Sequence, residues 1–260
     1  MKANTLGKKT LFLFDLDGVF YKGKENPVKL GGDRVVETLR ANGKKVLVVT
    51  NNSTDSVGTI RRRLSAMGIK LAEREILTSA RLTAQYLRAR NGAVRYYLVG
   101  EGGLEAEMRS CGHMRTEGLD AGYVVVGLDR SFTYGKLDKA VSLVRSGASL
   151  VATHNSKLYM YRDGPAVAAG PIVKAIEYGS GRRATVVGKP SRLMFRLALE
   201  TAACRSSEAV MVGDQVDTDI AGAEKAGIDS ILVATGVDRE ARGHRVLATV
   251  SKVDDIADYL

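Results

Sequence analysis

Leu11-Phe12-Leu13-Phe14-Asp15-Leu16-Asp17-Gly18 is the stretch that decides the fold of this chain of 260 residues. Its four consecutive apolar residues predict a strand that is buried on both faces, as in a parallel sheet. The strand ends in two carboxylates, at the position where open α/β sheets bind ligands. Asp15 and Asp17 can point to the same side, so holding them close requires a cation, a shared proton or both. Taken alone, the pattern is also typical of a capping aspartate beside a turn.

The composition is that of a globular protein, with 45% hydrophobic and 26% charged residues. No apolar run is long enough to span a membrane, and the N-terminus shows no signal-peptide core. The two cysteines, Cys111 and Cys204, fit a reducing compartment and favour neither a disulfide framework nor a zinc site. We therefore expect a cytoplasmic protein with one large α/β domain or two smaller ones.

The net charge of +10 raises the question of a nucleic-acid partner. The densest basic run, Arg61-Arg62-Arg63, falls on a predicted helix, where a solvated face is the expected role. No basic stretch is interleaved with aromatic residues, as nucleic-acid binding would favour. We expect no nucleic-acid and no membrane partner, but the positive field would attract small anions such as phosphate esters.

Strands and helices alternate along the chain, which predicts a doubly wound, Rossmann-like parallel sheet. Strands are predicted over 45–50, 95–99, 122–127, 149–153, 184–188, 209–214 and 230–233. Helices are predicted over 31–42, 55–67, 80–91, 101–110, 133–146, 166–178, 191–203, 217–227 and 253–259. No strand within 80–180 ends in an aspartate pair. We therefore expect a discontinuous catalytic core, 1–79 and 181–260, interrupted by an α/β insert, 80–180.

Four predicted core strands end in polar side chains, which a parallel sheet would bring to one edge. These are Asp15 with Asp17, Thr50 with Asn51, Lys189, and Asp214 with Asp219 just beyond. Carboxylate oxygens suit Mg²⁺, which readily shares its site with phosphate. The ammonium, hydroxyl and amide groups would hold phosphoryl oxygens as charge spreads over them. Each motif is weak alone, but the ordered set D-x-D-G, T-N, G-K-P and G-D-x-x-x-T-D is specific.

This ordered set resembles the haloacid dehalogenase (HAD) superfamily of aspartate-nucleophile phosphatases. The Thr50-Asn51-Asn52 form, the long insert and Thr235-Gly236-Val237 are similar to its NagD-like branch, which includes the 4-nitrophenylphosphatases. The resemblance covers nearly the whole chain. It implies a Mg²⁺-dependent phosphomonoester hydrolase with an α/β cap that acts on small phosphorylated metabolites. The class includes phosphoglycolate, glycerol phosphate, nucleotides and sugar phosphates, with 4-nitrophenyl phosphate as a substrate in vitro.

The resemblance also implies a role for each motif residue. Asp15 would attack phosphorus to form an aspartyl phosphate, and Asp17 would protonate the leaving alcohol and then activate water. The implied metal ligands are the Asp15 carboxylate, the backbone carbonyl of Asp17 and Asp214, with Asp219 supporting metal-bound water. Thr50, Asn51 and Lys189 would bind phosphate.

One segment departs from the branch pattern. The branch usually carries Thr-Asn-x-Asp in the insert, near the substrate, whereas this chain has Thr153-His154-Asn155-Ser156 followed by a polar stretch to Arg162. We expect His154 to contact substrate, with a hydrogen-bonded loop residue as the alternative. A homodimer formed through the insert is compatible with this interpretation.

Three other functions remain open on the sequence. A phosphoryl transferase or mutase would differ only in the acceptor. A receiver-type signalling domain also uses aspartates and a lysine, but it is about half this length and lacks an aspartate motif like Gly213-Asp214 after the lysine. A catalytically inactive binding protein is disfavoured because every catalytic position is filled.

Overall fold

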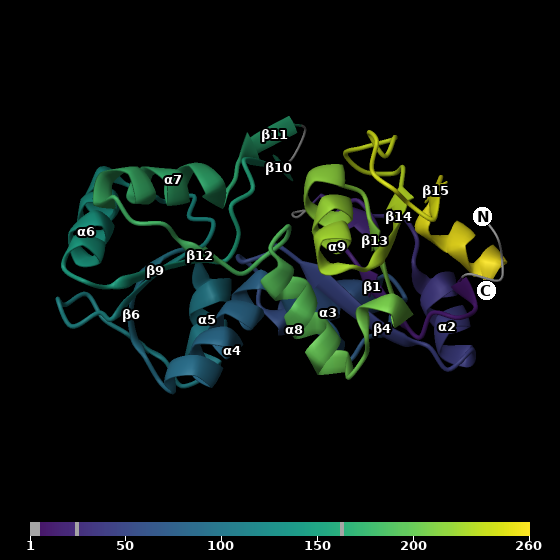
Figure 1. The fold of residues 1–260 in the computed structure, drawn as a ribbon, viewed down its shortest axis with the longest axis horizontal. Coiled ribbons are helices and arrows are strands. Elements are labelled where there is room, and N and C mark those ends of the chain that lie inside the picture. Colours follow the sequence, from purple (N-terminus) through teal and green to yellow (C-terminus); the bar gives the residue numbers. More distant parts are fainter. Residues whose placement is uncertain (1–5, 24–25, 162–163) are drawn as a thin grey trace. The chain divides into compact units, whose positions relative to one another are not determined.

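The computed structural model of the chain describes residues 6–23, 26–161 and 164–260 (Figure 1). The chain divides into two compact units. The first unit comprises the residues up to Thr50, Ile60–Leu77 and Lys189–Leu260. The second unit comprises Asn51–Thr59 and Thr78–Gly188.

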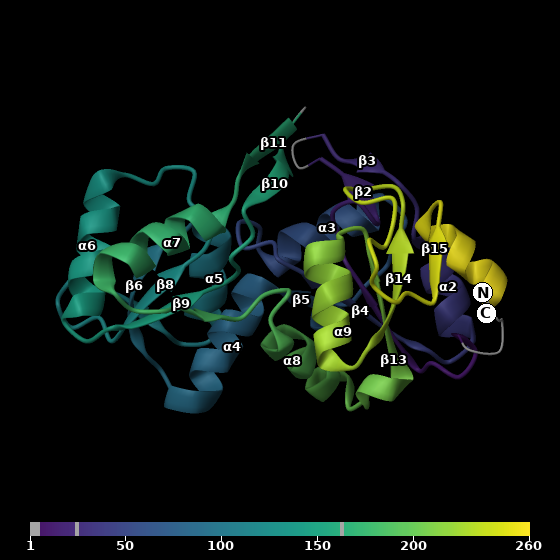
Figure 2. The ribbon, with the colours of Figure 1, turned by 45° about the horizontal axis from the view of Figure 1, so that its top comes forward.

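A six-stranded sheet forms the centre of the first unit, in the order β15-β14-β13-β1-β4-β5 (Figure 2). Its strands are β1 (Leu11–Phe14), β4 (Lys45–Thr50), β5 (Ile76–Thr78), β13 (Ala209–Gly213), β14 (Asp229–Val233) and β15 (Ala248–Val250). The central strand β1 pairs in parallel with β4 and β13, so that Phe14 lies opposite both Val48 and Val212. All three side chains are fully buried, as the apolar run predicts. This register brings the carboxyl ends of β1, β4 and β13 together.

Helices and a short hairpin complete the first unit. The helices are α2 (Asp33–Ala41), α8 (Arg192–Ala202), α9 (Ala221–Ala226), the 3₁₀ helices η1 (Glu73–Glu75), η2 (Ser206–Glu208) and η4 (Val253–Tyr259), and the π-helical turn η3 (Val216–Ile220). Helix α3 (Val57–Ala66) begins in the second unit and ends in the first. The hairpin pairs β2 (Tyr21–Lys22) with β3 (Val28–Lys29) directly after the aspartate motif. Asp254 of η4 accepts hydrogen bonds from Gly32 and Val35, which ties the C-terminal helix to the start of α2.

The second unit has its own parallel sheet, in the order β12-β9-β8-β6-β7. Its strands are β6 (Arg95–Val99), β7 (Met114–Arg115), β8 (Tyr123–Val126), β9 (Ser149–Ala152) and β12 (Thr185–Val186). The helices are α4 (Ser79–Asn91), α5 (Gly102–Ser110), α6 (Tyr134–Arg145) and α7 (Ala169–Ser180), and a hairpin joins β10 (Leu158–Tyr161) to β11 (Gly164–Val167). Val126 of β8, Leu143 of α6 and Ile176 of α7 share one buried core cluster.

The observed division corrects the expected placement of the strand before Lys189. We expected this strand in the catalytic sheet, but β12 pairs with β9, with Val186 opposite Ala152 in the second sheet. A run of apolar residues indicates a strand without specifying its partner, and β12 forms only two residues of ladder. The unit boundary therefore falls between Gly188 and Lys189 rather than near 180, and residues 51–59 also group with the second unit.

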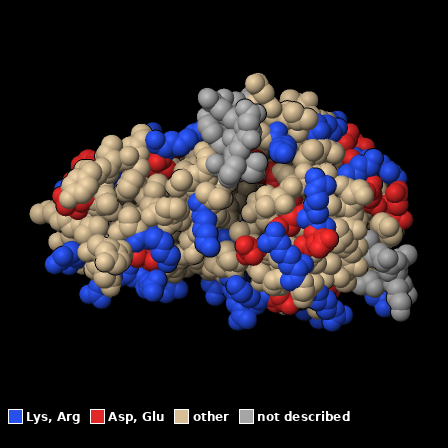
Figure 3. Space-filling view, turned by 90° about the horizontal axis from the view of Figure 1, so that it is seen from above, with Lys and Arg blue, Asp and Glu red and all other residues tan. Residues whose placement is uncertain are grey.

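Basic and acidic side chains are interspersed on the surface. On the face shown in Figure 3, basic side chains lie in separate groups with acidic side chains among them. Arg61 of the basic run contacts Glu73, and this pair lies on the surface of the first unit. Within the described parts of the chain, no helix has both the length and the apolar character that crossing a bilayer requires.

Candidate active site

Three buried aspartates meet at the carboxyl edge of the first sheet. Asp15 directly follows β1, and its backbone N–H donates to Val212 of β13 at 2.9 Å. Asp214 directly follows β13, and Asp219 lies in the π-helical turn η3. Each of the three offers a carboxylate oxygen, and these oxygens lie within 4.8 Å of one another. Such a cluster requires compensating positive charge.

Lys189 supplies part of that charge from within the first unit. Its Nζ lies 2.6 Å from Oδ1 of Asp15, to which it donates a hydrogen bond, and 2.7 Å from Oδ1 of Asp219. The Lys189 side chain is only 2% exposed. Lys189 therefore lies beside these carboxylates, although the strand that precedes the lysine belongs to the other sheet.

Burial and mutual repulsion shift the pKa values of the cluster. Burial raises the pKa of Asp15, while Lys189 opposes that rise. Burial, with Asp15 and Asp219 nearby, raises the pKa of Asp214 well above its usual value, and burial raises that of Asp219 to about 6. Burial alone would lower the pKa of Lys189, but Asp15 and Asp219 outweigh it and raise that pKa. The lysine therefore stays charged and the aspartates favour protons or a cation.

The two carboxylate oxygens of Asp214 have different surroundings. Its Oδ2 accepts the backbone N–H of Val237 at 2.9 Å, whereas its buried Oδ1 has no hydrogen-bond partner among the described residues. A Cβ at Gly18 or Gly236 would overlap the Asp214 carboxylate, and a Cβ at Gly213 would overlap that of Asp219. These glycines allow the backbone to approach both carboxylates closely. An all-oxygen, carboxylate-rich set of this kind fits a hard divalent cation such as Mg²⁺.

A loop after β14 holds the two aspartate segments together. Thr235 Oγ1 donates to the carbonyl of Gly18 at 2.6 Å, and the backbone N–H of Asp238 donates to the carbonyl of Asp214 at 3.0 Å. The Asp238 carboxylate accepts the N–H of Val216 at 2.8 Å and forms an ion pair with an exposed arginine, Arg242. Sequence reasoning noted Thr235 through the family resemblance but missed Asp238. Asp238 belongs to no motif in the sequence, so the sequence does not indicate that this carboxylate contacts the segment after β13.

Asp17 and Thr50 lie at the strand ends where the sequence placed them. Asp17 is half-buried and forms a backbone bridge with Tyr21, and it does not belong to the cluster of three carboxylates. Thr50 is the last residue of β4, next to β1, and is 2% exposed.

The second unit gathers its own polar residues at the end of β9. Asn51 Nδ2 donates to Ser156 Oγ at 3.3 Å, and the N–H of Ser156 donates to Nδ1 of His154 at 3.4 Å. His154 is 6% exposed, and the buried hydroxyl of Thr153 has no hydrogen-bond partner among the described residues. Arg162, at which the polar stretch after this loop ends, lies outside the described part of the chain.

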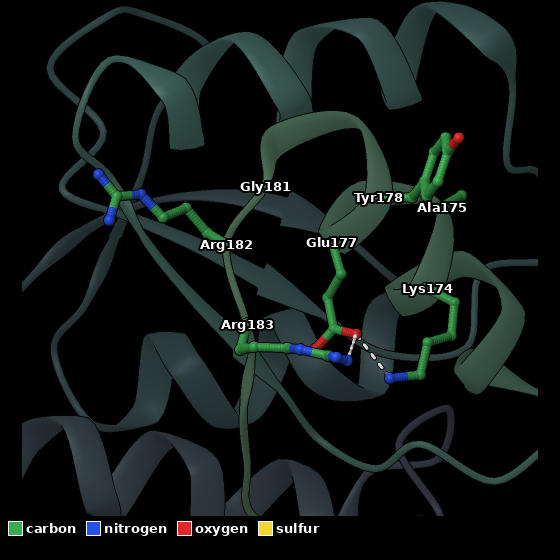
Figure 4. A pocket seen from close by; sticks show the side chains of 7 residues that line it. All are labelled: Lys174, Ala175, Glu177, Tyr178, Gly181, Arg182 and Arg183. Atoms are coloured by element: carbon green, nitrogen blue, oxygen red, sulfur yellow. Dashed lines mark hydrogen bonds and ion pairs between the residues drawn. The ribbon is translucent and has the colours of Figure 1, made fainter.

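A separate hollow on the second unit lies beside the end of α7 (Figure 4). Glu177 lies between two basic side chains there, accepting from Lys174 Nζ at 2.6 Å and from Arg183 at 3.4 Å. It also accepts the backbone N–H of Ala184 at 2.9 Å. None of the predicted site residues lines this hollow.

Comparison with known proteins agrees with this geometry. Two family models match, a haloacid dehalogenase-like hydrolase over residues 12–114 and a HAD-hydrolase-like model over 186–260. A dihydroxyacetone phosphatase from Corynebacterium glutamicum is 31% identical over 95% of this chain and 90% of its own length. The crystal structure of 4-nitrophenylphosphatase from Thermotoga maritima superposes with a TM-score of 0.90 at 31% identity, covering 98% of both chains.

NagD from E. coli K-12 is also similar, with a TM-score of 0.85 at 30% identity over 97% of this chain and 99% of that one. The match extends through both units, so it includes the insert as well as the aspartate motifs. Sequence motifs, sheet topology and relatives thus agree. The chain belongs to the haloacid dehalogenase-like hydrolases, and it is a phosphatase of the NagD-like group.

Proposed function

We propose that the chain hydrolyses phosphomonoesters of small metabolites with the help of Mg²⁺, through an aspartyl-phosphate intermediate. The observation that carries this proposal is the buried group of Asp15, Asp214 and Asp219 with Lys189 paired to two of its members. Triose and other sugar phosphates are the first substrates to test, because one relative is named a dihydroxyacetone phosphatase. Phosphoglycolate, glycerol phosphate and nucleotides follow, and 4-nitrophenyl phosphate is the reporter substrate.

Asp15 and Asp17 carry the covalent chemistry in this proposal. A carboxylate oxygen of Asp15 attacks phosphorus, the bond to the leaving oxygen breaks, and Asp17 gives that oxygen its proton. Asp17, now ionised, then takes a proton from water as the water attacks the aspartyl phosphate. Inorganic phosphate leaves and both aspartates return to their initial states. Two easier steps replace one difficult step, and the same group acts first as acid and then as base.

The carboxylates of Asp15 and Asp214 and the carbonyl of Asp17 would hold Mg²⁺, with Asp219 supporting its water ligands. When bound, the ion offsets the charge of the nucleophile and of the phosphoryl oxygens. Lys189 remains charged beside Asp15 and Asp219, so it holds Asp15 in place and attracts the phosphoryl group. The cluster thus binds a dianion beside an anionic nucleophile.

The remaining predicted residues bind the substrate. Thr50, buried at the end of β4, supplies a hydroxyl for the phosphoryl oxygens, and Asn51, the next residue along the chain, supplies an amide. We propose that the segment 80–180 determines substrate choice, with His154 contacting the leaving group. The buried hydroxyl of Thr153, which has no hydrogen-bond partner in the described parts of the chain, supports a polar role for this loop.

Replacing the nucleophile tests the proposal most directly. Asp15→Asn keeps the shape of the side chain but removes the attacking charge, so release of phosphate from 4-nitrophenyl phosphate should fall by at least about 10³-fold. Asp33→Asn is the matched control, because Asp33 is an exposed aspartate that pairs with Lys29. Wild-type turnover by Asp15→Asn would refute the mechanism. Measuring free phosphate separates hydrolysis from transfer to another acceptor.

A further inference from the structure

The first residue after the aspartate motif to enter regular structure is Tyr21, at the start of β2. Its side chain is fully buried. Its backbone carbonyl accepts the N–H of Gly18 at 2.8 Å, and its backbone bridges to Asp17. These backbone contacts to Tyr21 therefore stabilise the turn that carries Asp17.

The ring of Tyr21 is in turn held by one residue of a helix. Arg63 of α3 donates from its guanidinium to the Tyr21 hydroxyl at 3.1 Å. The same guanidinium carbon lies 5.5 Å from the centre of the Tyr21 ring, within the range of a cation–π contact. The planar guanidinium therefore fixes both the tip and the face of the ring. A buried tyrosine hydroxyl needs such a partner, so the contact also determines where the ring packs.

These contacts form a chain from Arg63 through Tyr21 to Asp17, and all of them lie within the first unit. We propose that Arg63 and Tyr21 are positioning residues that hold the Asp17 carboxyl where it can protonate the leaving oxygen. The inference rests on the proposed function, in which Asp17 is the general acid. Neither Arg63 nor Tyr21 needs to touch the substrate for this role.

The expected consequence is specific because acid catalysis matters only for some substrates. Phenyl phosphate and 4-nitrophenyl phosphate are similar in shape, but phenolate is a much more basic leaving group than 4-nitrophenolate. Departure of phenolate requires the proton, whereas 4-nitrophenolate leaves readily without it. A displacement of Asp17 should therefore slow the first substrate more than the second. The constant kcat/KM isolates this step, because it reports events up to departure of the first product.

The experiment measures kcat/KM on both esters for the wild type, Arg63→Ala and Tyr21→Phe. Arg63→Ala should lose about tenfold more activity on phenyl phosphate than on 4-nitrophenyl phosphate, since misplacing a catalytic group forfeits part of its contribution. Tyr21→Phe removes only the hydroxyl that Arg63 contacts, and it should show the same selectivity to a smaller extent. It also carries the test if Arg63→Ala does not fold.

Arg61→Ala is the matched control, because Arg61 lies on the same helix but contacts Glu73 on the surface. It should leave the ratio of the two rate constants unchanged. An equal loss on both esters in Arg63→Ala and Tyr21→Phe would assign these residues to stability or phosphate binding and overturn the inference. Asp17→Asn distinguishes a failure of the positioning role of Arg63 and Tyr21 from a failure of the acid role of Asp17. If it shows the selective loss and Arg63→Ala does not, only the inference fails, whereas no selective loss in Asp17→Asn refutes the acid role itself.

Discussion

At the residue scale, the chain uses two buried lysines in different ways. Lys189 contacts Asp15 and Asp219 at the carboxyl edge of the first sheet, where charge develops during the proposed reaction. Lys9 lies at the amino ends of β1 and β14, where its Nζ contacts Asp229 at 2.6 Å and the carbonyl of Ser207 at 2.7 Å. Under the proposed mechanism, the buried charge of Lys189 serves catalysis at one edge of the sheet, and that of Lys9 serves stability at the other.

Replacing each lysine should separate these two roles. Lys189→Met should lower kcat on 4-nitrophenyl phosphate by about 10²-fold or more, because a preorganised charge beside the phosphoryl group is removed. Lys9→Met should leave kcat within twofold of the wild type, as a rough bound, and lower the free energy of unfolding by about 1–3 kcal/mol. Steady-state kinetics and urea unfolding measure both effects. The opposite pattern would place Lys189 among the structural residues.

The sequence could predict a site residue where a regular strand places it, but not where an irregular loop does. Asp15 and Asp214 directly follow apolar strands of one parallel sheet, so they lie near one edge whatever the details of the loops. Lys189 reaches the same edge by another route, because the strand before it, β12, pairs with β9 in the second sheet. Asp238 could not be predicted in this way. Its carboxylate reaches Val216 only because the irregular loop after β14 folds back over the end of β13.

At the element scale, long periodic segments were predictable and short ones were not. The strands Lys45–Thr50 and Arg95–Val99 have the predicted bounds, because each is an apolar run closed by polar residues or glycine. The three-residue strands β5 and β15 and the hairpins β2–β3 and β10–β11 were missed. A segment of two or three residues contains too little periodicity to be recognised, and its neighbours in the sheet determine that it is extended. Four-residue strands were predicted where they lie in a clear apolar run, as in β1 and β8, but not in the hairpin β10–β11.

The loop after β9 gives the prediction that belongs to this scale. His154→Ala should change the order in which the enzyme prefers phosphate esters, because a contact to the leaving group acts on only some substrates. Activity on 4-nitrophenyl phosphate should stay within about threefold of wild type. A panel of triose, sugar and glycerol phosphates, read by phosphate release, measures the change. His113→Ala is the control, since His113 is a buried histidine of the same unit bonded to Val94 and Ala84.

A uniform loss on every ester in His154→Ala would place His154 in catalysis or stability instead. An effect of the same kind in His113→Ala would show that any disturbance of the second unit alters specificity. Only a changed order of substrates that is restricted to the His154 variant supports the assignment.

At the scale of the whole molecule, we expect the aspartate cluster to couple folding to pH and, under the proposed function, to Mg²⁺. The pKa of Asp219 is raised to about 6, and that of Asp214 is also raised, above the value of about 3.9 for an unfolded aspartate. Without metal, the folded state therefore holds more protons than the unfolded state between these values. The stability that Asp219 contributes is fully present below about pH 4 and is lost as pH rises through about 6, and Asp214 adds a contribution of the same sign.

Mg²⁺ should restore that stability, because it binds the ionised carboxylates of the folded state only. At a concentration about 100 times the Kd, the gain is about 2.7 kcal/mol, which corresponds to roughly 5 °C in Tm for a chain of this size. Calorimetry in EDTA and in Mg²⁺ should therefore show a larger rise in Tm at pH 7.5 than at pH 5. Asp214→Asn should abolish most of the rise, whereas Asp33→Asn should keep it. An equal rise at both pH values, or a full rise in Asp214→Asn, would mean that Mg²⁺ binds elsewhere on the chain.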